Sequence, residues 1–339
     1  MEFDQSDMAE QTIDIREDKI LARSPELLAA LLKDHTMSRV KGRDCNIFWA
    51  TADYAPLGEG FQYGDEILPE NITGKYGDVV QPRVCKDRDT QTARSRDKAE
   101  VFTPSWICNA QNNLIDAAWF GREGVFNTEL PDHTWAVNTA AVTFPEGKTW
   151  LDYVRDTRLE ITCGEAPYLA SRYDTVTGEY IPLERRIGII DRKLRVVSEN
   201  CRTSGEWLDA AQTAYKSTYA YEWQGDSLLI ARETLLYTFM EYYRRQFGRD
   251  PLDKSLKNIA YIISWNVWQM DGLRGVIPGT CGQPRVESGL FGDEVITRPC
   301  EGCRTGDIHA HNGIQCLIRD WRKSPREKQV EPFVKSISR

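Results

Sequence analysis

The chain has 339 residues, of which 41% are apolar and 10% aromatic, and its formal net charge is −8. This composition excludes global disorder and allows one large α/β domain with added elements, or two modest domains. The negative charge excludes a whole-protein attraction for nucleic acid, so DNA contact would require a locally basic surface. No apolar run reaches about 18 residues, and the acidic start lacks a signal-peptide pattern. We therefore expect a cytoplasmic protein with no membrane partner.

The first part of the chain predicts an extension with little regular structure. Residues 1–20 are polar and acidic and predict a mobile or partner-dependent arm. Residues 24–36 (SPELLAALLKDHT) predict a short helix, because a serine and a proline precede residues of high helix propensity. Residues 51–82 are rich in Gly, Pro and Asp and predict a loop. We assign residues 1–82 to an N-terminal extension.

A basic segment at 83–98 leads into the next predicted helix, at 103–121 (TPSWICNAQNNLIDAAWFG). Thr103 is expected to cap this helix, Pro104 to occupy its first turn, and Gly121 to end it. One stripe of the helix is apolar, and we expect it to face the core. It consists of Ile107, Ala110, Leu114 and Ala118.

Strands and helices are expected to alternate after residue 158. Strand-like segments are predicted at 158–160, 187–197, 218–223 and 259–268, and helices at 205–217 and 225–248. This alternation predicts a parallel, doubly wound sheet. In such a sheet the ligand lies beyond the carboxyl ends of the strands. Polar or small residues follow three of the predicted strands: Glu160 with Cys163-Gly164, Glu222, and Asp271.

Four segments in this order resemble the S-adenosylmethionine-dependent amino-DNA methyltransferases, in particular the adenine-N6 enzymes of restriction–modification systems. AEVFTP (99–104) is similar to the family's Phe-Thr-Pro motif, and LEITCGEAPYL (159–169) to its glycine-containing turn. YAYEWQGDSLLIARETLL (219–236) resembles the ribose motif with its helix, and ISWNVWQMDGL (263–273) the segment that borders the adenine. The order of motifs, each on its expected element, is more specific than any single one.

The resemblance implies a Rossmann-like methyltransferase fold over 83–280, S-adenosylmethionine as cofactor, and methyl transfer to adenine N6 in DNA. It also implies a restriction or specificity subunit as a further partner, in restriction–modification or phage defence. The cofactor-binding residues are implied one by one. Phe102, Thr103 and Pro104 would line the methionine end, Glu160, Cys163 and Gly164 would form the turn, Glu222 would hold the ribose, and Asp271 would hold the adenine.

The sequence departs from the family at important positions. Ile161 stands where the family has Pro, and Ala166 where it has a second Gly, which we expect to be tolerated if φ is negative there. The catalytic Asp/Asn-Pro-Pro-aromatic tetrapeptide is absent. Its nearest substitute is Asp320-Trp321 in CLIRDW (316–321), which offers an acceptor and a stacking ring. The alternative for this pair is a surface strand that ends in a charged residue and a packed Trp.

A cluster of cysteines and histidines at 298–321 predicts a structural zinc site. Nine cysteines, an odd number, fit a reducing compartment with some thiols on metal better than a disulfide framework. Tetrahedral zinc binds four N or S ligands. The spacing predicts Cys300, Cys303, His311 and Cys316 as these ligands. His309 competes with His311, Cys281 is a possible substitute, and a loop with free thiols is the alternative. We assign 281–317 to this segment.

The last segment, 318–339, has more basic than acidic residues. It is either a DNA backbone contact or a solvated tail. The predicted function is therefore a DNA adenine-N6 methyltransferase-like protein. Two alternatives stay open: a catalytically silent subunit of the same fold that binds DNA or supports assembly, and a base-modifying enzyme that uses the same pocket for different chemistry.

Overall fold

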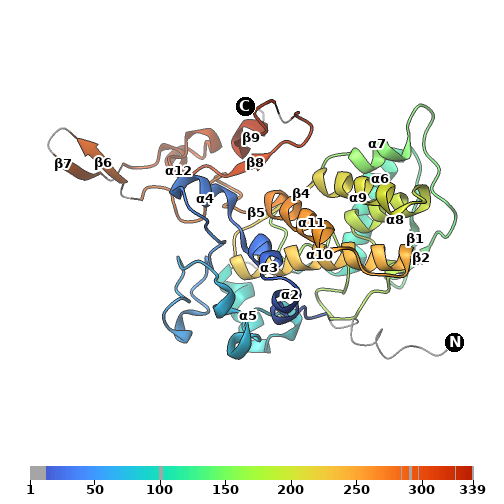
Figure 1. The fold of residues 1–339 in the computed structure, drawn as a ribbon, viewed down its shortest axis with the longest axis horizontal. Coiled ribbons are helices and arrows are strands. Elements are labelled where there is room, and N and C mark those ends of the chain that lie inside the picture. The colour runs from blue at the N-terminus through green and yellow to red at the C-terminus, as the bar shows by residue number, and fades with distance from the viewer. Residues whose placement is uncertain are drawn as a thin grey trace.

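The computed structural model describes residues 13–98, 102–283, 285–289, 292–296, 298–324 and 326–337 (Figure 1). The first part of the expected arm, residues 1–12, lies outside the described residues. The described part is a mixed α/β structure with one small parallel sheet. Among its helices, none combines the length and the apolar character needed to cross a membrane.

The helices gather mainly in the middle of the chain (Figure 1). They are α2 Glu17–Arg23, α3 Pro25–Leu32, α4 His35–Lys41, α5 Arg88–Lys98, α6 Ser105–Phe120, α7 Trp150–Arg155, α8 Ile189–Asn200, α9 Ser204–Lys216, α10 Gly225–Phe247, α11 Asp253–Asn266 and α12 Glu301–Thr305. Residues 51–82 contain short 3₁₀ turns and one isolated bridge residue, Glu66, as expected for a loop.

The parallel sheet has the strand order β3–β4–β5. Its strands are β3 Arg158–Glu160, β4 Thr218–Glu222 and β5 Val267–Gln269. The other described strands form antiparallel pairs: β1 Asn127–Glu129 with β2 Trp135–Val137, β6 Arg285–Gly289 with β7 Gly292–Ile296, and β8 Leu317–Arg319 with β9 Val330–Pro332. The sheet is thus smaller than the doubly wound sheet that the sequence predicts.

The two faces of the sheet pack against different parts of the chain. Ala220 and Val267, which lie opposite each other in the register, belong to the main core with the buried residues of α8–α11. Tyr221 and Trp268 point to the other face and pack with Cys316 and other residues of the C-terminal segment. This difference follows from the alternation of side chains along a strand.

The predicted N-terminal extension does not form a separate layer. Leu28 and Leu31 of α3, together with Trp49 and Ile67 of the loop, are fully buried in the same core as α10 and α11. In Figure 1, α3 lies beside α10 and α11. Residues 24–67 therefore complete the hydrophobic core rather than extend from it.

Two strand predictions are wrong. Residues 187–197 fall mainly in helix α8, whose buried side contains Ile190, Leu194 and Val197 at helical spacing. Most of 259–268 belongs to helix α11, and only Val267–Gln269 is strand. Short apolar runs fit a buried helix as well as a buried strand, so their composition alone did not separate the two.

Helix α6 ends at Gly121 as predicted, with φ of 69°, but its orientation is not the expected one. It buries polar residues, among them Asn109, Asn112 and Asp116. Leu114, placed in the predicted core stripe, is 71% exposed. The apolar side of α6 is therefore turned partly toward solvent.

Candidate ligand cavity and candidate metal centre

A cavity of about 920 Å³ opens at the carboxyl ends of β3 and β4. A site of this size accommodates a ligand as large as a nucleoside with an amino-acid tail. Most of the predicted cofactor residues, which are far apart in the sequence, meet here. They are Phe102, Thr103, Glu160, Cys163, Gly164 and Glu222.

The floor of the cavity is a turn with three left-handed residues. Thr162, Gly164 and Ala166 have φ values of 47°, 53° and 61°. The condition under which Ala166 was expected to be tolerated, a negative φ, is therefore not met, because alanine adopts here the conformation for which glycine is the usual residue. Non-glycine residues in this region cost about 1–2 kcal/mol each and tend to occur at functional sites.

Glu222 holds this turn in place. Its carboxylate accepts the N–H of Gly164 at 2.8 Å and, through the other oxygen, the N–H of Trp223 at 2.8 Å and of Gln224 at 3.2 Å. Burial raises the pKa of Glu222 above its ordinary value, although these three N–H groups act in the opposite direction. The carboxylate lines the cavity at the end of β4, and its two oxygens retain acceptor capacity for a ligand hydroxyl.

Glu160 lies at the end of β3 with one oxygen unsatisfied. Its Oε1 accepts a long hydrogen bond of 3.4 Å from the N–H of Tyr168, whereas Oε2 is buried without a partner. Burial raises the pKa of Glu160 well above its ordinary value. A buried acceptor without a partner at the wall of a cavity is a position where a ligand donor gains a hydrogen bond.

Phe102 closes the cavity from the side of α6. Its ring lies 3.9 Å from the position that a Cβ on Gly164 would take, so the turn and the aromatic ring are near van der Waals contact. Pro104 is the N-cap residue of α6 rather than its first residue, and Thr103 does not cap the helix. Pro104 does not line the cavity.

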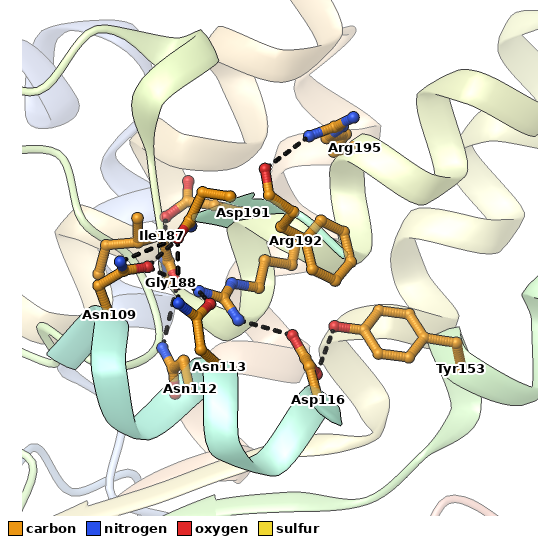
Figure 2. Close-up of polar contacts among 12 residues, drawn as sticks. Asn109, Asn112, Asn113, Asp116, Tyr153, Ile187, Gly188, Asp191, Arg192 and Arg195 are labelled. Atoms are coloured by element: carbon orange, nitrogen blue, oxygen red, sulfur yellow. Dashed lines mark hydrogen bonds and ion pairs between the residues drawn. The ribbon is translucent and has the colours of Figure 1, made fainter. Parts of the chain in front are cut away.

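A buried polar network fixes α6 beside the cavity (Figure 2). Asn112 donates to the carbonyl oxygens of Tyr168 at 3.1 Å and Ile187 at 3.0 Å. Arg192 of α8 donates to Asp116 at 2.7 Å, and the hydroxyl of Tyr153 donates to the same carboxylate at 3.0 Å. Because these groups are buried and paired, α6 cannot rotate to bury its apolar side without breaking several of them.

Two acids are the only charged side chains that line the cavity within the described chain. They are Glu160 and Glu222, and no Lys or Arg is present in the lining. Sites for phosphate-bearing nucleotides normally offer basic groups or a helix N-terminus. The cavity therefore suits a ligand that is neutral or cationic and has hydroxyl or amino donors.

Asp271 does not line this cavity. Its carboxylate is paired with Arg274 at 3.2 Å and accepts the N–H of Leu273 at 3.1 Å. The side chain is buried in the turn that follows β5. The structure thus places Asp271 outside the lining of this cavity, and its contact with an adenine base stays a prediction.

Asp320 and Trp321 lie in a different cavity, of about 560 Å³, with Tyr219 and Trp268. Asp320 forms an ion pair with Arg322 at 2.9 Å, and the hydrogen bonds from Arg322 lower its pKa. Trp321 donates its indole N–H to Asn266 at 2.7 Å. The predicted catalytic pair is therefore not brought to the turn at Gly164, because Tyr219 lies near the amino end of β4 and Glu222 at its carboxyl end.

Three cysteines and one histidine form a compact cluster in the C-terminal segment. The ligand atoms of Cys281, Cys300, Cys303 and His311 all lie within 4.8 Å of one another. The Nδ1 atom of His311 is 3.6, 3.4 and 3.7 Å from the three sulfurs in that order. Zn–S bonds of about 2.3 Å and Zn–N bonds of about 2.0 Å separate S and N by roughly 3.5 Å across a tetrahedral angle. The cluster could hold a metal ion, and its ligand set and spacing are those of a zinc site.

The structure corrects one member of the predicted set. Cys316 is fully buried in the second hydrophobic cluster, where its thiol donates to the carbonyl of Gln269 at 3.4 Å. Cys281 takes its place in the cluster, and His311 rather than His309 is the histidine of the cluster. A strand pairing of 317–319 with 330–332 directs Cys316 into the core, which the spacing of cysteines could not indicate.

The backbone around the cluster is shaped for it. A Cβ on Gly302 would lie 2.6 Å from Cγ of His311, so only glycine fits between Cys300 and the imidazole. Burial raises the pKa of the Cys300 thiol, but hydrogen bonds from the N–H groups of Asn312 and Cys303 and from His311 outweigh it and lower the pKa to about 6. A thiolate is the form that binds metal.

Some lining residues of the cavity were not predicted. Ala50 and Tyr63 come from the N-terminal segment, and Trp223, Gln224 and Ser227 follow β4. Only the last three had a signal in the sequence, since they follow a strand that ends in an acid. The contribution of residues 50–63 depends on long-range packing and leaves no local pattern.

No family model, curated protein or solved structure matches this chain. The resemblance to the amino-DNA methyltransferases therefore rests on the motifs in the sequence.

Proposed function

We propose that the chain binds S-adenosylmethionine and serves in methyl transfer to adenine N6 in DNA, within a restriction–modification or phage-defence system. The observation that carries the proposal is the convergence of three sequence motifs on one cavity. Phe102, Gly164 and Glu222 come from separate motifs, and all three line it. A Rossmann-like arrangement of the sheet, with the ligand at the carboxyl ends of its strands, belongs to the same proposal.

The charge of the cavity supports this ligand over nucleotides. S-Adenosylmethionine has a sulfonium cation, an ammonium group, one carboxylate and no phosphate, so it is cationic overall, and the lining holds acids without basic residues. Glu222 would accept hydrogen bonds from the ribose hydroxyls, and the bound cofactor would be the methyl donor. Glu160, with its unsatisfied buried oxygen, would accept from the ammonium group.

Calorimetric titration of the chain with S-adenosylmethionine and with its demethylated product tests this proposal. We expect both to bind, and ATP and NAD not to bind, because a phosphate would approach two acids. Absence of binding for both adenosyl compounds, in protein whose fold is intact by circular dichroism, contradicts the proposal.

A second function is favoured by one observation: Asp320 and Trp321 lie in another cavity. The chain would then be a methyltransferase-like subunit that binds the cofactor without its own catalytic tetrapeptide. Transfer of a tritiated methyl group to DNA by the chain alone separates the two. Transfer by the chain alone supports the enzyme, and cofactor binding without transfer supports the subunit.

A further inference from the structure

One face of the parallel sheet is covered only in part. Leu159 lies opposite Tyr219 in the register, and Tyr221 lies opposite Trp268. Because Tyr219 and Tyr221 are two residues apart on β4, all four side chains point to the same face. Parallel sheets normally have both faces covered. Here the C-terminal segment packs on this face, and a cavity of about 560 Å³ remains between its residues and those of the strands. We call it the second cavity.

Aromatic rings from both layers line the second cavity. Tyr219 and Trp268 belong to the strands, and Trp321 and Phe333 to the C-terminal segment. Trp268 and Phe333 are buried, whereas Tyr219 and Trp321 are half-buried. The rings of Tyr219 and Trp321 therefore have surface left for a ligand, and a flat ring is the partner that an aromatic face prefers.

The acids of the second cavity are neutralised within the protein. Two acidic residues, Asp320 and Glu331, line it. Asp320 pairs with Arg322 at 2.9 Å, and Glu331 pairs with Lys323 at 3.0 Å. Neither carboxylate is thus left to attract a cationic ligand.

Two cations of the same lining have no such partner. Arg155 is the last residue of α7 and Lys216 the last residue of α9, and neither forms an ion pair within the described part of the chain. The Nζ atom of Lys216 lies 5.5 Å from the centre of the Trp321 ring. The second cavity therefore combines an excess of positive charge with aromatic surface, whereas only acids are charged in the lining of the ligand cavity.

This combination fits a nucleotide. Stacking of a base on an aromatic side chain contributes about 1–3 kcal/mol, and phosphates pair with Lys and Arg. Because the chain has a formal net charge of −8, a DNA contact requires a locally basic surface, which Arg155 and Lys216 provide. A DNA strand has a phosphate on either side of each base, and this matches two separate cations beside one aromatic surface.

We propose that the second cavity binds a nucleotide of a single DNA strand, with its base against Tyr219 and Trp321 and its flanking phosphates at Arg155 and Lys216. That the strand is DNA rests on the proposed function, whereas the aromatic and cationic lining does not. The second cavity and the ligand cavity have only Leu159 in common. The bound nucleotide is therefore held apart from the cofactor and positions the strand.

The test measures the fluorescence anisotropy of a fluorescein-labelled oligothymidylate of about 12 nucleotides with the full chain at low salt. An abasic strand of the same length keeps the phosphates and lacks the bases. We expect the oligothymidylate to bind and the abasic strand to bind at least about tenfold more weakly. The corresponding duplex should also bind more weakly, because its bases are stacked inside the helix.

Substitutions assign the binding to the second cavity. Arg155→Glu and Lys216→Glu should each weaken binding of the oligothymidylate by about tenfold. Arg249→Glu and Lys254→Glu, at exposed residues outside both cavities, are the matched controls and should leave binding nearly unchanged. Trp321→Leu should weaken binding of the oligothymidylate and not of the abasic strand, and Trp321→Phe should restore it. A loss of fold would affect both strands.

Several results would overturn the inference. They are absence of oligothymidylate binding, equal binding of the abasic strand, and equal losses in Arg155→Glu and Arg249→Glu. Tighter binding of the duplex overturns it in favour of double-stranded DNA, and tighter binding of an oligouridylate in favour of RNA. Displacement of the strand by the peptide Glu-Trp-Glu at a lower concentration than by thymidine monophosphate overturns it in favour of an acidic peptide.

Calorimetric titration with S-adenosylmethionine keeps this inference apart from the proposed function. Arg155 and Lys216 lie outside the ligand cavity, so their variants should bind the cofactor as the natural chain does. Cofactor binding without strand binding overturns the inference alone. Strand binding that depends on Arg155 and Trp321, in a chain that binds no cofactor, overturns the proposed function alone.

Discussion

The ligand cavity and the metal cluster of this chain are built in opposite ways. The cavity draws its lining from residues between Ala50 and Ser227, and its floor is held by strained backbone and by the carboxylate of Glu222. The cluster lies between Cys281 and His311, and its four potential ligand atoms lie within 4.8 Å of one another. One site is organised by the fold before its ligand arrives, and the other is expected to be organised by its ligand.

The largest effect is expected at the metal cluster, where the difference between the two sites is easiest to test. His311→Ala should reduce bound zinc from about one ion per chain to almost none, because three sulfur ligands leave the tetrahedral site incomplete. His309→Ala is the matched control and should retain the ion. Metal analysis of the purified proteins measures both. Equal loss in the two variants would contradict the assignment of His311.

A smaller effect on the same site is expected from Gly302→Ala. The added Cβ would lie 2.6 Å from the imidazole of His311, so the histidine must shift and zinc affinity should fall by about 10–100-fold. Competition with a chelating dye measures this. Gly205→Ala in α9, where nothing lies within 4 Å of the new Cβ, should leave affinity unchanged. Unchanged affinity in Gly302→Ala would show that the cluster tolerates rearrangement.

Substitutions of two acids, Glu222 and Asp271, test the cavity. The resemblance assigns both of them to cofactor binding. Glu222→Gln should weaken S-adenosylmethionine binding by about 1.5–3 kcal/mol, because a hydrogen bond to a charged group is lost. Asp271→Asn should have little effect, since Asp271 lies outside the cavity. Titration calorimetry of both variants gives the comparison. A larger loss of affinity in Asp271→Asn than in Glu222→Gln would support the contact with the adenine that the motif implies.

The smallest effect concerns the strained turn. Thr162 is exposed and has φ of 47°, so Thr162→Gly should stabilise the fold by about 1 kcal/mol. Thr92→Gly, at an exposed position within helix α5, should destabilise it by a similar amount. Thermal unfolding of the two variants measures these opposite shifts. If Thr162→Gly also weakens ligand binding, the strain contributes to preorganisation.

The sequence predicted the helices and the central strand where local signals were strong. Helix α10 and strand β4 lie where expected, and Gly121 ends α6. It failed where burial decides the structure. Residues 187–197 fall in α8, which is buried on several sides, and α6 turns its polar residues inward, where Asp116 pairs with Arg192. The exchange of Cys316 for Cys281 depends on strand pairing that no spacing encodes.

The candidate site residues show the same contrast between local sequence signals and long-range packing. Phe102, Gly164 and Glu222 were identified from motifs, because each follows a local turn or strand end. The left-handed φ at Ala166 could not be foreseen, since no propensity predicts that alanine will take this conformation. The role of Asp320 was inferred from its order along the chain and from its acceptor beside an aromatic ring, and neither indicates which end of a strand a later segment reaches.

Helix α10 begins against the N-terminal segment. A Cβ on Gly225 would lie 2.1 Å from the carbonyl oxygen of Phe48, and the N–H of Gly225 donates to Trp49 at 3.0 Å. Two segments separated by about half of the chain thus meet backbone to backbone beside the cavity wall. Contacts between distant residues form late because loop closure is costly in entropy. The cavity should therefore be among the last parts to assemble, and a chain emerging during synthesis should bind ligand only after α10 has docked.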